Sequence, residues 1–254
     1  MALITGAGSG IGAATAILFA RLGAKLSLTG RNEVNLQRVG DECVRVGPAD
    51  TEGRPFTVVA ELTREADVAS LVDATVKKFG RLDILVNNAG IWAFDTIETT
   101  SLEQYDRMMA INLRATFQLT MLCVPHLIAT RGNVVNVSSV AGTHSFPGEL
   151  AYSMSKSAMD QMTRCSALEL GSKGVRVNSV NPALIFTEIQ RRAAMTEDQY
   201  SRCVEGETRK YPLGRVGDAD EVAHAIAFLA SSSASFITGE HLHIDGGWHA
   251  ACPH

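Results

Sequence analysis

The chain has 254 residues, of which 46% are hydrophobic and 20% charged, so it can bury the core of one large α/β domain. Its formal net charge is -4, its basic residues are scattered and aromatic residues are few, which argues against a nucleic-acid-binding surface and a membrane-surface helix. No basic leader with a long apolar stretch opens the sequence, and no run of about eighteen apolar residues occurs. Small-molecule chemistry is favoured by elimination.

The cysteines indicate a reducing compartment, and we expect a cytoplasmic protein. They are odd in number, widely spaced and never form a C-x-x-C pair, which argues against a disulfide framework and a zinc knuckle. The five are Cys43, Cys123, Cys165, Cys203 and Cys252.

Seven short apolar runs alternate with stretches of helical period, and each run is predicted to be a β-strand. Helix-length crossovers exclude hairpins, so the strands should lie parallel with helices on both faces of a doubly wound α/β sheet. No repeat or linker divides the chain, so residues 1–254 should form one domain, with 1–100 mainly binding a dinucleotide and 101–254 holding the catalytic residues. The predicted strands are residues 2–5, 25–29, 56–60, 82–86, 133–137, 175–180 and 241–244.

A glycine-rich turn follows the first predicted strand, where residues 5–12 read TGAGSGIG before a helix over 13–22. Glycines there let backbone N–H groups approach a pyrophosphate at a helix N-terminus. The alternative is a turn that needs glycine for steric reasons alone. The strand-turn-helix setting favours dinucleotide binding.

The end of the second strand indicates which dinucleotide is bound. An NAD site normally carries an acidic residue there for the ribose 2′-hydroxyl, and this chain has Gly30 followed by Arg31. The Arg31 guanidinium could grip a 2′-phosphate, which favours NADP(H) over NAD(H). The alternative is an ordinary solvated arginine.

A tyrosine and a lysine occupy positions for proton transfer. Tyr152 and Lys156 are four residues apart on a predicted helix, so both side chains emerge on one face, and a nearby ammonium favours the phenolate. Ser139, at the end of the fifth strand, can hydrogen-bond a reacting oxygen, with Ser138 as the competing candidate. Such a pair is also common on solvated surfaces, and such a serine is often a helix cap.

In these motifs the sequence resembles the short-chain dehydrogenase/reductase superfamily, in its single-domain form. The resemblance rests on TGAGSGIG, on Asn87-Asn88-Ala89-Gly90, on Ser139 and on Tyr152-Ser153-Met154-Ser155-Lys156, and it runs from Ala2 to about Gly247. It implies a Rossmann-like, seven-stranded parallel sheet of order 3-2-1-4-5-6-7. Within the superfamily, the sequence resembles bacterial-type 3-oxoacyl-carrier-protein reductases and their animal relatives that act as carbonyl reductases or hydroxysteroid dehydrogenases.

The resemblance also implies roles for the site residues. Tyr152 would exchange a proton with the substrate oxygen, Lys156 would also bind the nicotinamide ribose hydroxyls, and Asn88 to Gly90 would form the wall behind the adenosine and ribose. Asn112, inside a predicted apolar helix, is either a satisfied core amide or the holder of a water that relays protons to Lys156. The implied catalytic residues are Asn112, Ser139, Tyr152 and Lys156, and the implied cofactor residues are Gly6, Ser9, Gly10, Ile11, Gly12, Arg31, Glu61, Leu62, Asn88, Ala89, Gly90, Tyr152, Lys156, Pro182, Ile185 and Thr187.

Three departures from the family pattern stand out. Ala183 replaces the usual glycine after Pro182, so the turn must avoid a glycine-only conformation or bear strain. Glu61 stands where the family commonly has aspartate to frame the adenine. Met1 directly precedes the first strand, which is expected either to be short or to reflect a trimmed beginning.

Residues after the motifs indicate the substrate side. A polar stretch over about 188–211 is predicted to be a mobile helical flap. His241 and His243 share one face of a strand, which favours a packed or interface pair over a metal site, so we expect no metal. Six residues could line a mixed apolar cleft, with core packing as the alternative for the phenylalanines: Trp92, Phe94, His144, Phe146, Leu184 and Phe186.

The sequence therefore predicts an NADP(H)-dependent oxidoreductase that transfers a hydride between nicotinamide and a ketone or secondary alcohol. The alternatives are an NAD-dependent alcohol or hydroxysteroid dehydrogenase and a non-catalytic dinucleotide-binding protein. The predicted helices over 102–127 and 150–172 carry apolar residues beyond one face. They indicate a homotetramer, which the family resemblance also implies.

Overall fold

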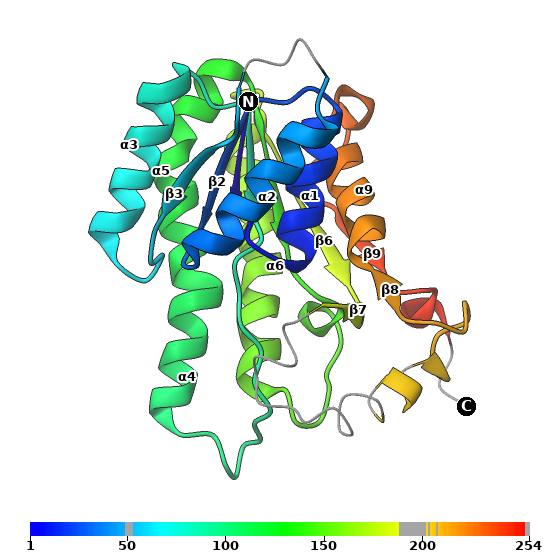
Figure 1. Ribbon diagram of the computed structural model, residues 1–254. Helices are drawn as coiled ribbons and strands as arrows, with labels where there is room; N and C mark the ends of the chain where they lie inside the picture. The colour runs from blue at the N-terminus through cyan, green and yellow to red at the C-terminus, as the bar shows by residue number, and fades with distance from the viewer. Residues whose placement is uncertain (49–52, 188–201, 203, 207, 252–254) are drawn as a thin grey trace.

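The computed structural model describes residues 1–48, 53–187, 202, 204–206 and 208–251. The seven apolar runs form one parallel sheet of order β3-β2-β1-β4-β5-β6-β9, running toward the lower end of Figure 1. With β9 as the seventh strand, the predicted fold class and strand order are confirmed. The strands are β1 (Ala2–Thr5), β2 (Leu26–Gly30), β3 (Phe56–Val59), β4 (Ile84–Asn87), β5 (Asn133–Val137), β6 (Arg176–Pro182) and β9 (His241–Ile244).

Helices cover both faces of the sheet. On one face pack α1 (Gly10–Arg21), α2 (Glu33–Val46) and α9 (Ala219–Ala230), and on the other α3 (Glu65–Phe79), α5 (Ala115–Thr130) and α6 (Leu150–Gly171). Alternation along the strands fills both layers, because Ala2 and Ile4 of β1 enter the first core and Leu3 enters the second. Within the described ranges, no helix is long and apolar enough to cross a bilayer.

Several strand ends differ from the prediction by one or two residues. The β2 strand begins at Leu26 rather than Lys25, and β4 begins at Ile84 rather than Leu82. Ladder partners decide these ends, since Ile84 is the first β4 residue in register with both β1 and β5. Leu82 is fully buried but precedes the ladder, so its apolar character alone was misleading.

The helix predicted over 102–127 is interrupted. It consists of α4 (Leu102–Met109), a π-helical turn η1 (Ala110–Arg114) and α5, which continues to Thr130 with Pro125 inside it. A π turn inserts an extra residue without changing the apolar pattern much, so periodicity did not reveal it. This turn carries Asn112.

A second, two-stranded parallel sheet was not predicted. It pairs β7 (Ile185–Phe186) with β8 (Gly217–Asp218). Two-residue strands have no measurable period, so only tertiary pairing defines them. The small sheet joins the chain just after β6 to the start of α9.

The sheet reverses its winding between β1 and β4, and hydrogen bonds fix the carboxyl ends of these two strands together. The Thr5 hydroxyl accepts from the N–H groups of Asn88 and Ala89, both at 2.9 Å, and the Asn88 amide donates to the Thr5 carbonyl at 2.9 Å. Ligands of open parallel sheets collect at such a switch point. A ligand site is therefore expected at the carboxyl edge of the sheet, which lies at the lower end of Figure 1.

A buried polar ladder holds the helices behind this edge. Asn87 Nδ2 donates to Thr120 of α5 and to Asn136 of β5, both at 2.9 Å, and Asn136 Nδ2 donates to Thr163 of α6 at 2.8 Å. Buried amides without partners are costly, so this ladder permits few alternative packings. It fixes the position of α6 relative to the carboxyl edge of the sheet.

Candidate active site

The turn between β1 and α1 fits only glycine at three positions. Gly6 and Gly10 adopt left-handed backbone conformations, with φ of 62° and 52°. A Cβ on Gly12 would lie 2.4 Å from the Gly6 carbonyl oxygen. The turn thus needs its glycines for steric reasons, and the same glycines bring the α1 N-terminus to the switch point, where it can bind a pyrophosphate. The two interpretations of the turn are therefore compatible.

Two adjoining hollows open at this edge, of about 490 Å³ beside the ends of β2 and β3 and about 170 Å³ beside β5 and α6. Both include Gly6, Ser9, Ala89 and Gly90, so they form one elongated site. The first adds Arg31, Glu61 and Leu62 from the predicted cofactor set. The second adds Gly10, Ile11, Asn88, Tyr152, Lys156, Pro182, Ile185 and Thr187.

The predicted cofactor residues fit an extended dinucleotide. The glycine turn lies where the hollows join, so a pyrophosphate there would face the α1 N-terminus, with one nucleoside on each side. Ser9, the N-cap residue of α1, makes no side-chain capping bond to its first turn. Of the predicted set only Gly12 lines neither hollow, because it packs against Gly6.

Arg31 and Glu61 meet at the far end of the first hollow. An Arg31 nitrogen lies 3.7 Å from Glu61 Oε2, and the Arg31 side chain is 62% exposed. The other Glu61 oxygen accepts from the Thr63 hydroxyl at 3.1 Å. A guanidinium so exposed and so loosely paired can turn to another anion.

Lys156 and Tyr152 project together from α6 into the second hollow. Lys156 Nζ lies 5.6 Å from the centre of the Tyr152 ring and donates to the Val137 carbonyl at 2.9 Å. Lys156 is only 4% exposed. The i, i+4 spacing thus places an ammonium over a phenol, and the surface alternative does not apply.

Ser139 is directed into the same hollow. Its hydroxyl accepts from the Ala141 N–H at 3.1 Å and lies 3.5 Å from the Pro182 carbonyl, so it caps a 3₁₀ turn, η2 (Val140–Gly142), as well as lining the site. The Ser138 hydroxyl is directed elsewhere, toward the Lys156 carbonyl at 3.4 Å. The geometry favours Ser139 over Ser138.

Asn112 is fully buried in the π turn η1 and lines neither hollow. Its Oδ1 accepts from the Ile91 N–H at 2.8 Å, and its Nδ2 donates to the Ile91 carbonyl at 2.9 Å and to Ser155 at 3.1 Å. In this structure its amide is therefore a satisfied core amide that ties the loop after β4 to α6. Gly90 is close to it, since a Cβ there would lie 3.3 Å from Asn112 Oδ1 and 3.8 Å from Lys156 Nζ.

Similarity to known proteins decides the family. A family model described as enoyl-(acyl carrier protein) reductase matches residues 6–249. A 3-oxoacyl-(acyl-carrier-protein) reductase FabG from Thermotoga maritima is 39% identical over 249 residues, with 96% of each chain covered. The chain belongs to the short-chain dehydrogenase/reductase family.

Other relatives of this short-chain dehydrogenase/reductase differ in the substrates that their names state. An L-fucose dehydrogenase from Bos taurus is 38% identical over 253 residues, covering 96% of this chain and 87% of the relative. The crystal structure of levodione reductase matches with a TM-score of 0.92 at 33% identity, covering 99% of this chain and 98% of that one. The family and these names support an oxidoreductase that transfers a hydride between nicotinamide dinucleotide and CH–OH or C=O groups.

In this short-chain dehydrogenase/reductase, burial disfavours the charged forms of both Tyr152 and Lys156. Burial raises the pKa of Tyr152 above its ordinary value and outweighs the Ser139 hydrogen bond, while Glu149 acts in the same direction as burial. Burial also lowers the pKa of Lys156 to about 8, with Asp160 acting against it. The expected effect of the ammonium on the phenol is therefore not what determines the pKa of Tyr152 in this structure, because desolvation dominates.

Sequence reasoning missed Trp248, which contacts two of the six residues predicted to line the substrate cleft. Its ring stacks on Phe146 with centres 5.1 Å apart and meets His144 edge-on at 4.9 Å. Gly246 and Gly247, with φ of 63° and 89°, turn the chain back toward these residues after β9. That glycine pair was the available signal, but no local pattern determines which distant side chains the next residue contacts.

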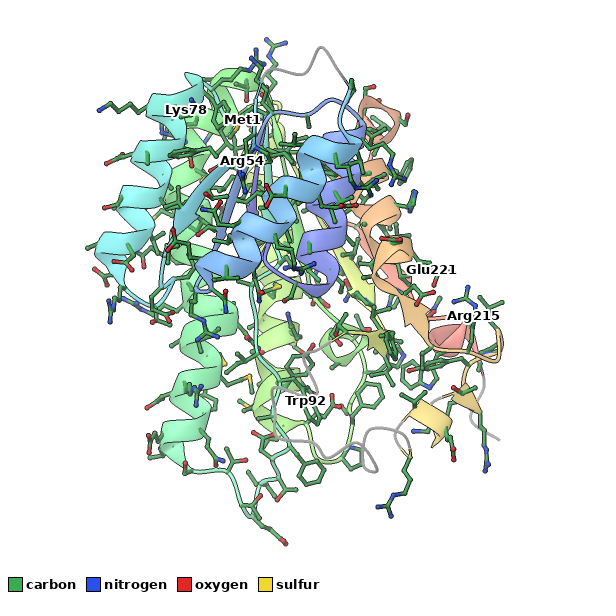
Figure 2. All side chains as sticks on the ribbon, viewed as in Figure 1. Met1, Arg54, Lys78, Trp92, Arg215 and Glu221 are labelled. Atoms are coloured by element: carbon green, nitrogen blue, oxygen red, sulfur yellow. The ribbon has the colours of Figure 1, made fainter. Side chains whose placement is uncertain are left out.

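The other predicted substrate-side residues are spread around the carboxyl end of the sheet, where Figure 2 shows Trp92. Phe94 and Phe186 are 69% and 57% exposed, so core packing does not account for them. Phe94 covers Gly148, where a Cβ would lie 2.2 Å from the ring. Leu184 donates its N–H to the Tyr211 hydroxyl at 3.1 Å.

The two histidines of β9 have different partners. His241 contacts Ser179 and Arg164, whereas His243 contacts the Thr143 hydroxyl at 3.2 Å and stacks on His249, with ring centres 4.4 Å apart. Among the residues that the structure places, no group of three or more His, Cys, Asp or Glu side chains could hold a metal ion. The geometry thus favours a packed role for both.

The departures from the family pattern are accommodated locally. Ala183 donates its N–H to the Ile244 carbonyl at 3.1 Å. Across the described ranges, Arg131 is the only non-glycine residue with positive φ, so Ala183 bears no left-handed strain. Most of the predicted flap, residues 188–201, 203 and 207, lies outside the described residues.

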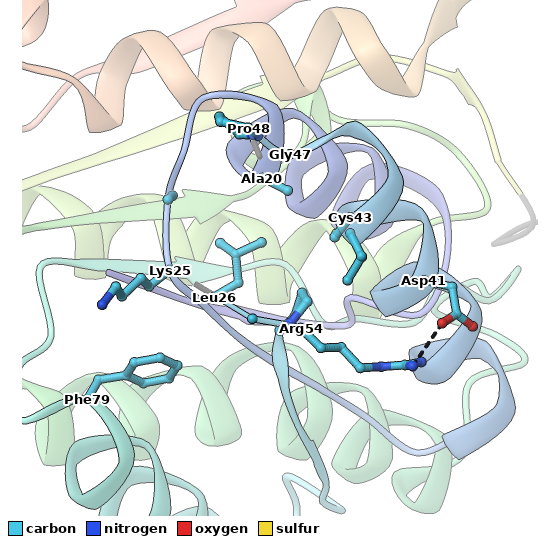
Figure 3. A pocket seen from close by; sticks show the side chains of 13 residues that line it. Ala20, Lys25, Leu26, Asp41, Cys43, Gly47, Pro48, Arg54 and Phe79 are labelled. Atoms are coloured by element: carbon cyan, nitrogen blue, oxygen red, sulfur yellow. Dashed lines mark ion pairs between the residues drawn. The ribbon is translucent and has the colours of Figure 1, made fainter. Parts of the chain in front are cut away.

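A further hollow of about 390 Å³ lies at the opposite end of the sheet (Figure 3). Lys25, Cys43, Arg54 and Phe79 line it, and Arg54 pairs with Asp41 at 2.8 Å. Figure 2 shows Arg54 at the end of the molecule opposite to Trp92. This hollow takes no part in the chemistry at the carboxyl edge.

Proposed function

We propose that this protein is an NADP(H)-dependent oxidoreductase that reduces a ketone or oxidises the corresponding secondary alcohol. The observation that carries the proposal is the convergence of Ser139, Tyr152 and Lys156 on one hollow beside the glycine turn. The bound nicotinamide supplies or accepts the hydride. The protein's own groups then need only to bind, orient and exchange one proton.

Each of these side chains has a distinct task. The Ser139 hydroxyl orients the substrate oxygen, and Tyr152 donates its phenolic proton to that oxygen. Lys156 keeps a positive charge beside the phenol and binds ribose hydroxyls. Because burial raises the pKa of Tyr152, its phenol is neutral in this state, which suits proton donation in the direction of carbonyl reduction.

Arg31 supports the preference for NADP(H). It lines the first hollow, where Gly30 offers no carboxylate to a ribose 2′-hydroxyl, and its guanidinium is exposed. NAD-dependent dehydrogenase activity is the second candidate, favoured by Glu61, whose carboxylate lies 3.7 Å from Arg31 and would repel a 2′-phosphate. The two candidates differ in a measurable way.

Arg31→Ala tests the cofactor assignment. We expect the Kd for NADPH to rise about 10- to 100-fold, because hydrogen bonds to a charged group contribute about 1.5–3 kcal/mol, while the Kd for NADH changes little. Tryptophan fluorescence titration measures both constants, with Arg38→Ala on α2 as the matched control. Equal affinity of the parent protein for NADPH and NADH would refute the Arg31 assignment, and tighter binding of NADH would support the NAD-dependent candidate.

The substrate class follows from a panel rather than from the motifs. The relatives' names include a 3-oxoacyl thioester, a sugar and a cyclic diketone, so the panel should hold one of each. We expect loss of NADPH absorbance with the thioester or the diketone, or formation of NADPH from NADP⁺ and the sugar. Absence of turnover with every member, together with tight NADPH binding, would favour a non-catalytic dinucleotide-binding protein.

We also propose a homotetramer in the cytoplasm. Phe117 and Met121 of α5 and Leu168 of α6 are 55%, 53% and 85% exposed, which leaves apolar surface on helices flanking the site. Burial raises the pKa of Cys43 and of Cys123 to about 12, so both thiols stay protonated and unreactive. Free thiols of this kind suit a reducing compartment.

A further inference from the structure

A line of polar groups connects the outer side of α6 with Ser139, and the proposed chemistry leaves most of it unexplained. At its outer end, an Arg164 side-chain nitrogen lies 2.8 Å from His241 Nε2, and His241 Nδ1 lies 2.7 Å from Ser179 Oγ. Ser179 Oγ donates to Asn181 Oδ1 at 2.7 Å. The line thus crosses from β9 to β6, two neighbouring strands.

The donors along this line have one consistent direction. A guanidinium can only donate, so His241 Nε2 accepts from Arg164, and the neutral imidazole carries its hydrogen on Nδ1. Burial lowers the pKa of His241, which supports the neutral form. His241 Nδ1 then donates to Ser179, whose own hydrogen goes to Asn181 Oδ1. The Asn181 amide is therefore held with its NH₂ group facing the catalytic side.

The Asn181 NH₂ group ends the line at two acceptors. It donates to the Ser139 carbonyl at 2.9 Å and to Asp160 Oδ2 at 2.8 Å. The Asp160 carboxylate packs directly against the turn after Ser139, since a Cβ on Gly142 would lie 2.3 Å from Asp160 Oδ2. Asn181 thus fixes the main chain of Ser139 relative to α6.

Asp160 is an unusual residue for such a place. It is 1% exposed, and its Oδ1 has no hydrogen-bond partner among the described residues, with His241 Nδ1 3.8 Å away. A buried carboxylate with an unpaired oxygen is destabilising unless a positive charge compensates it. Lys156 lies one helical turn earlier on α6 and donates to the Val137 carbonyl rather than to Asp160, and the Asp160 charge acts against the burial that lowers the pKa of Lys156.

We propose that Asp160 and Asn181 are positioning residues for the reaction: Asp160 supplies a buried negative charge one helical turn from Lys156, and Asn181 holds the Ser139 main chain and the Asp160 carboxylate. The inference rests on the proposed function, in which Lys156 acts as an ammonium and Ser139 binds the reacting oxygen. Tyr152 is the titratable group that faces Lys156 on its other side. The charged and titratable groups around Asp160 are Lys156 and Arg164 of α6, and His241 and His243 of β9.

Asp160→Asn removes the charge and keeps the shape. Without the carboxylate, Lys156 loses its proton at lower pH, so the alkaline decline of kcat/KM for carbonyl reduction should move toward acid by about 0.5–1 pH unit. In the ligand-free protein, carbon-13 NMR of labelled lysine, assigned with Lys156→Arg, should show the same direction of shift. A midpoint equal to that of the parent protein in both measurements would overturn the charge role.

Asn181→Ala separates position from charge. It frees the Ser139 main chain and keeps the Asp160 carboxyl group, although it removes the donor to Asp160 Oδ2. The kcat should therefore fall about tenfold, as for a misplaced oxygen-binding group, while the alkaline midpoint moves less than in Asp160→Asn. An unchanged kcat would overturn the role of Asn181. An acid shift as large as that of Asp160→Asn would overturn the division of roles.

Arg164→Ala keeps the proposal testable if Asp160→Asn fails to fold. Arg164 is exposed, so its removal should leave the fold intact, yet His241 loses the donor that fixes its hydrogen on Nδ1. We expect kcat to fall about two- to fivefold, the effect of one weakened hydrogen bond, while Arg21→Ala on α1 leaves it unchanged. A parent-like kcat in Arg164→Ala would overturn the line of hydrogen bonds.

The outcome also separates this inference from the proposed function. Turnover of the parent protein that survives Tyr152→Phe refutes the proposed function itself. Turnover that depends on Tyr152 but keeps its pH profile in Asp160→Asn refutes only the role of Asp160.

Discussion

In Tyr152 and Lys156, sequence spacing determines the position of the two side chains, and burial determines the direction of their pKa shifts. Their separation on α6 brings the ammonium to 5.6 Å from the phenol ring, as helix geometry requires. Burial then raises the pKa of Tyr152 and lowers that of Lys156 to about 8, so each group is biased toward its neutral form. At neutral pH Lys156 still carries most of its charge, and in the proposed mechanism that charge favours the phenolate once the proton has left for the substrate.

Tyr152→Phe tests the residue scale. Because only the phenolic proton is lost, we expect kcat to fall at least about 100-fold, while the Kd for NADPH stays within about twofold. Steady-state kinetics and fluorescence titration measure the two effects. Tyr105→Phe on α4 is the matched control, and a Tyr152→Phe protein with parent-like kcat would contradict the mechanism.

At the scale of elements, the N-terminus of α6 is capped by a residue that is distant in the sequence. Its N-cap residue, Glu149, makes no side-chain capping bond, and the Ala151 N–H instead donates to both Asp95 carboxylate oxygens, at 3.3 and 3.2 Å. Asp95 is 3% exposed, and its own N–H donates to the Gly148 carbonyl at 2.9 Å. The loop after β4 therefore fixes where the helix carrying Tyr152 begins.

Asp95→Ala should weaken this helix start. Loss of a cap costs about 1 kcal/mol, which lowers Tm by about 2–4 °C in a chain of this size. Thermal unfolding followed by circular dichroism measures the change, with Asp73→Ala on the exposed side of α3 as control. A Tm equal to that of the control variant would show that Asp95 contributes no cap.

At the scale of the whole molecule, exposed apolar side chains occur on both faces, and only those on α5 and α6 are proposed to form a subunit interface. Phe117 and Met121 stand about one turn apart on α5, and Val34 of α2 is even more exposed, at 77%, on the other face of the sheet. If the homotetramer forms through α5 and α6, the two regions should respond differently to charge. Apolar surface buried between subunits contributes roughly 25 cal/mol per Å², so one buried charge there is strongly disruptive.

Phe117→Glu therefore tests the assembly. We expect the parent protein to sediment at about four times the mass of one 27.2 kDa chain and Phe117→Glu to sediment as a smaller species. Analytical ultracentrifugation distinguishes these states. Val34→Glu should leave the mass unchanged, and a Phe117→Glu protein of parent-like mass would contradict an interface on α5.

Much of the architecture could be predicted from the sequence alone because it rests on local physics. Alternating apolar runs and helix-length crossovers determine a parallel sheet with two covered faces, and the glycines of the first turn determine where α1 can begin. The i, i+4 spacing determined that Tyr152 and Lys156 share a helix face. Ser139 and Arg31 were identifiable because their positions at strand ends have chemical meaning.

Only the tertiary structure decided the rest, because it depends on contacts between segments far apart in the chain. The π turn at Asn112, the Asp95 cap, the Trp248 stack and the pairing of Arg31 with Glu61 all join residues that no local period connects. Burial is equally non-local, and it is the main reason why the pKa of Tyr152 is raised. A pattern of residues states what each group can do, whereas neighbours and solvent access determine which form each group takes.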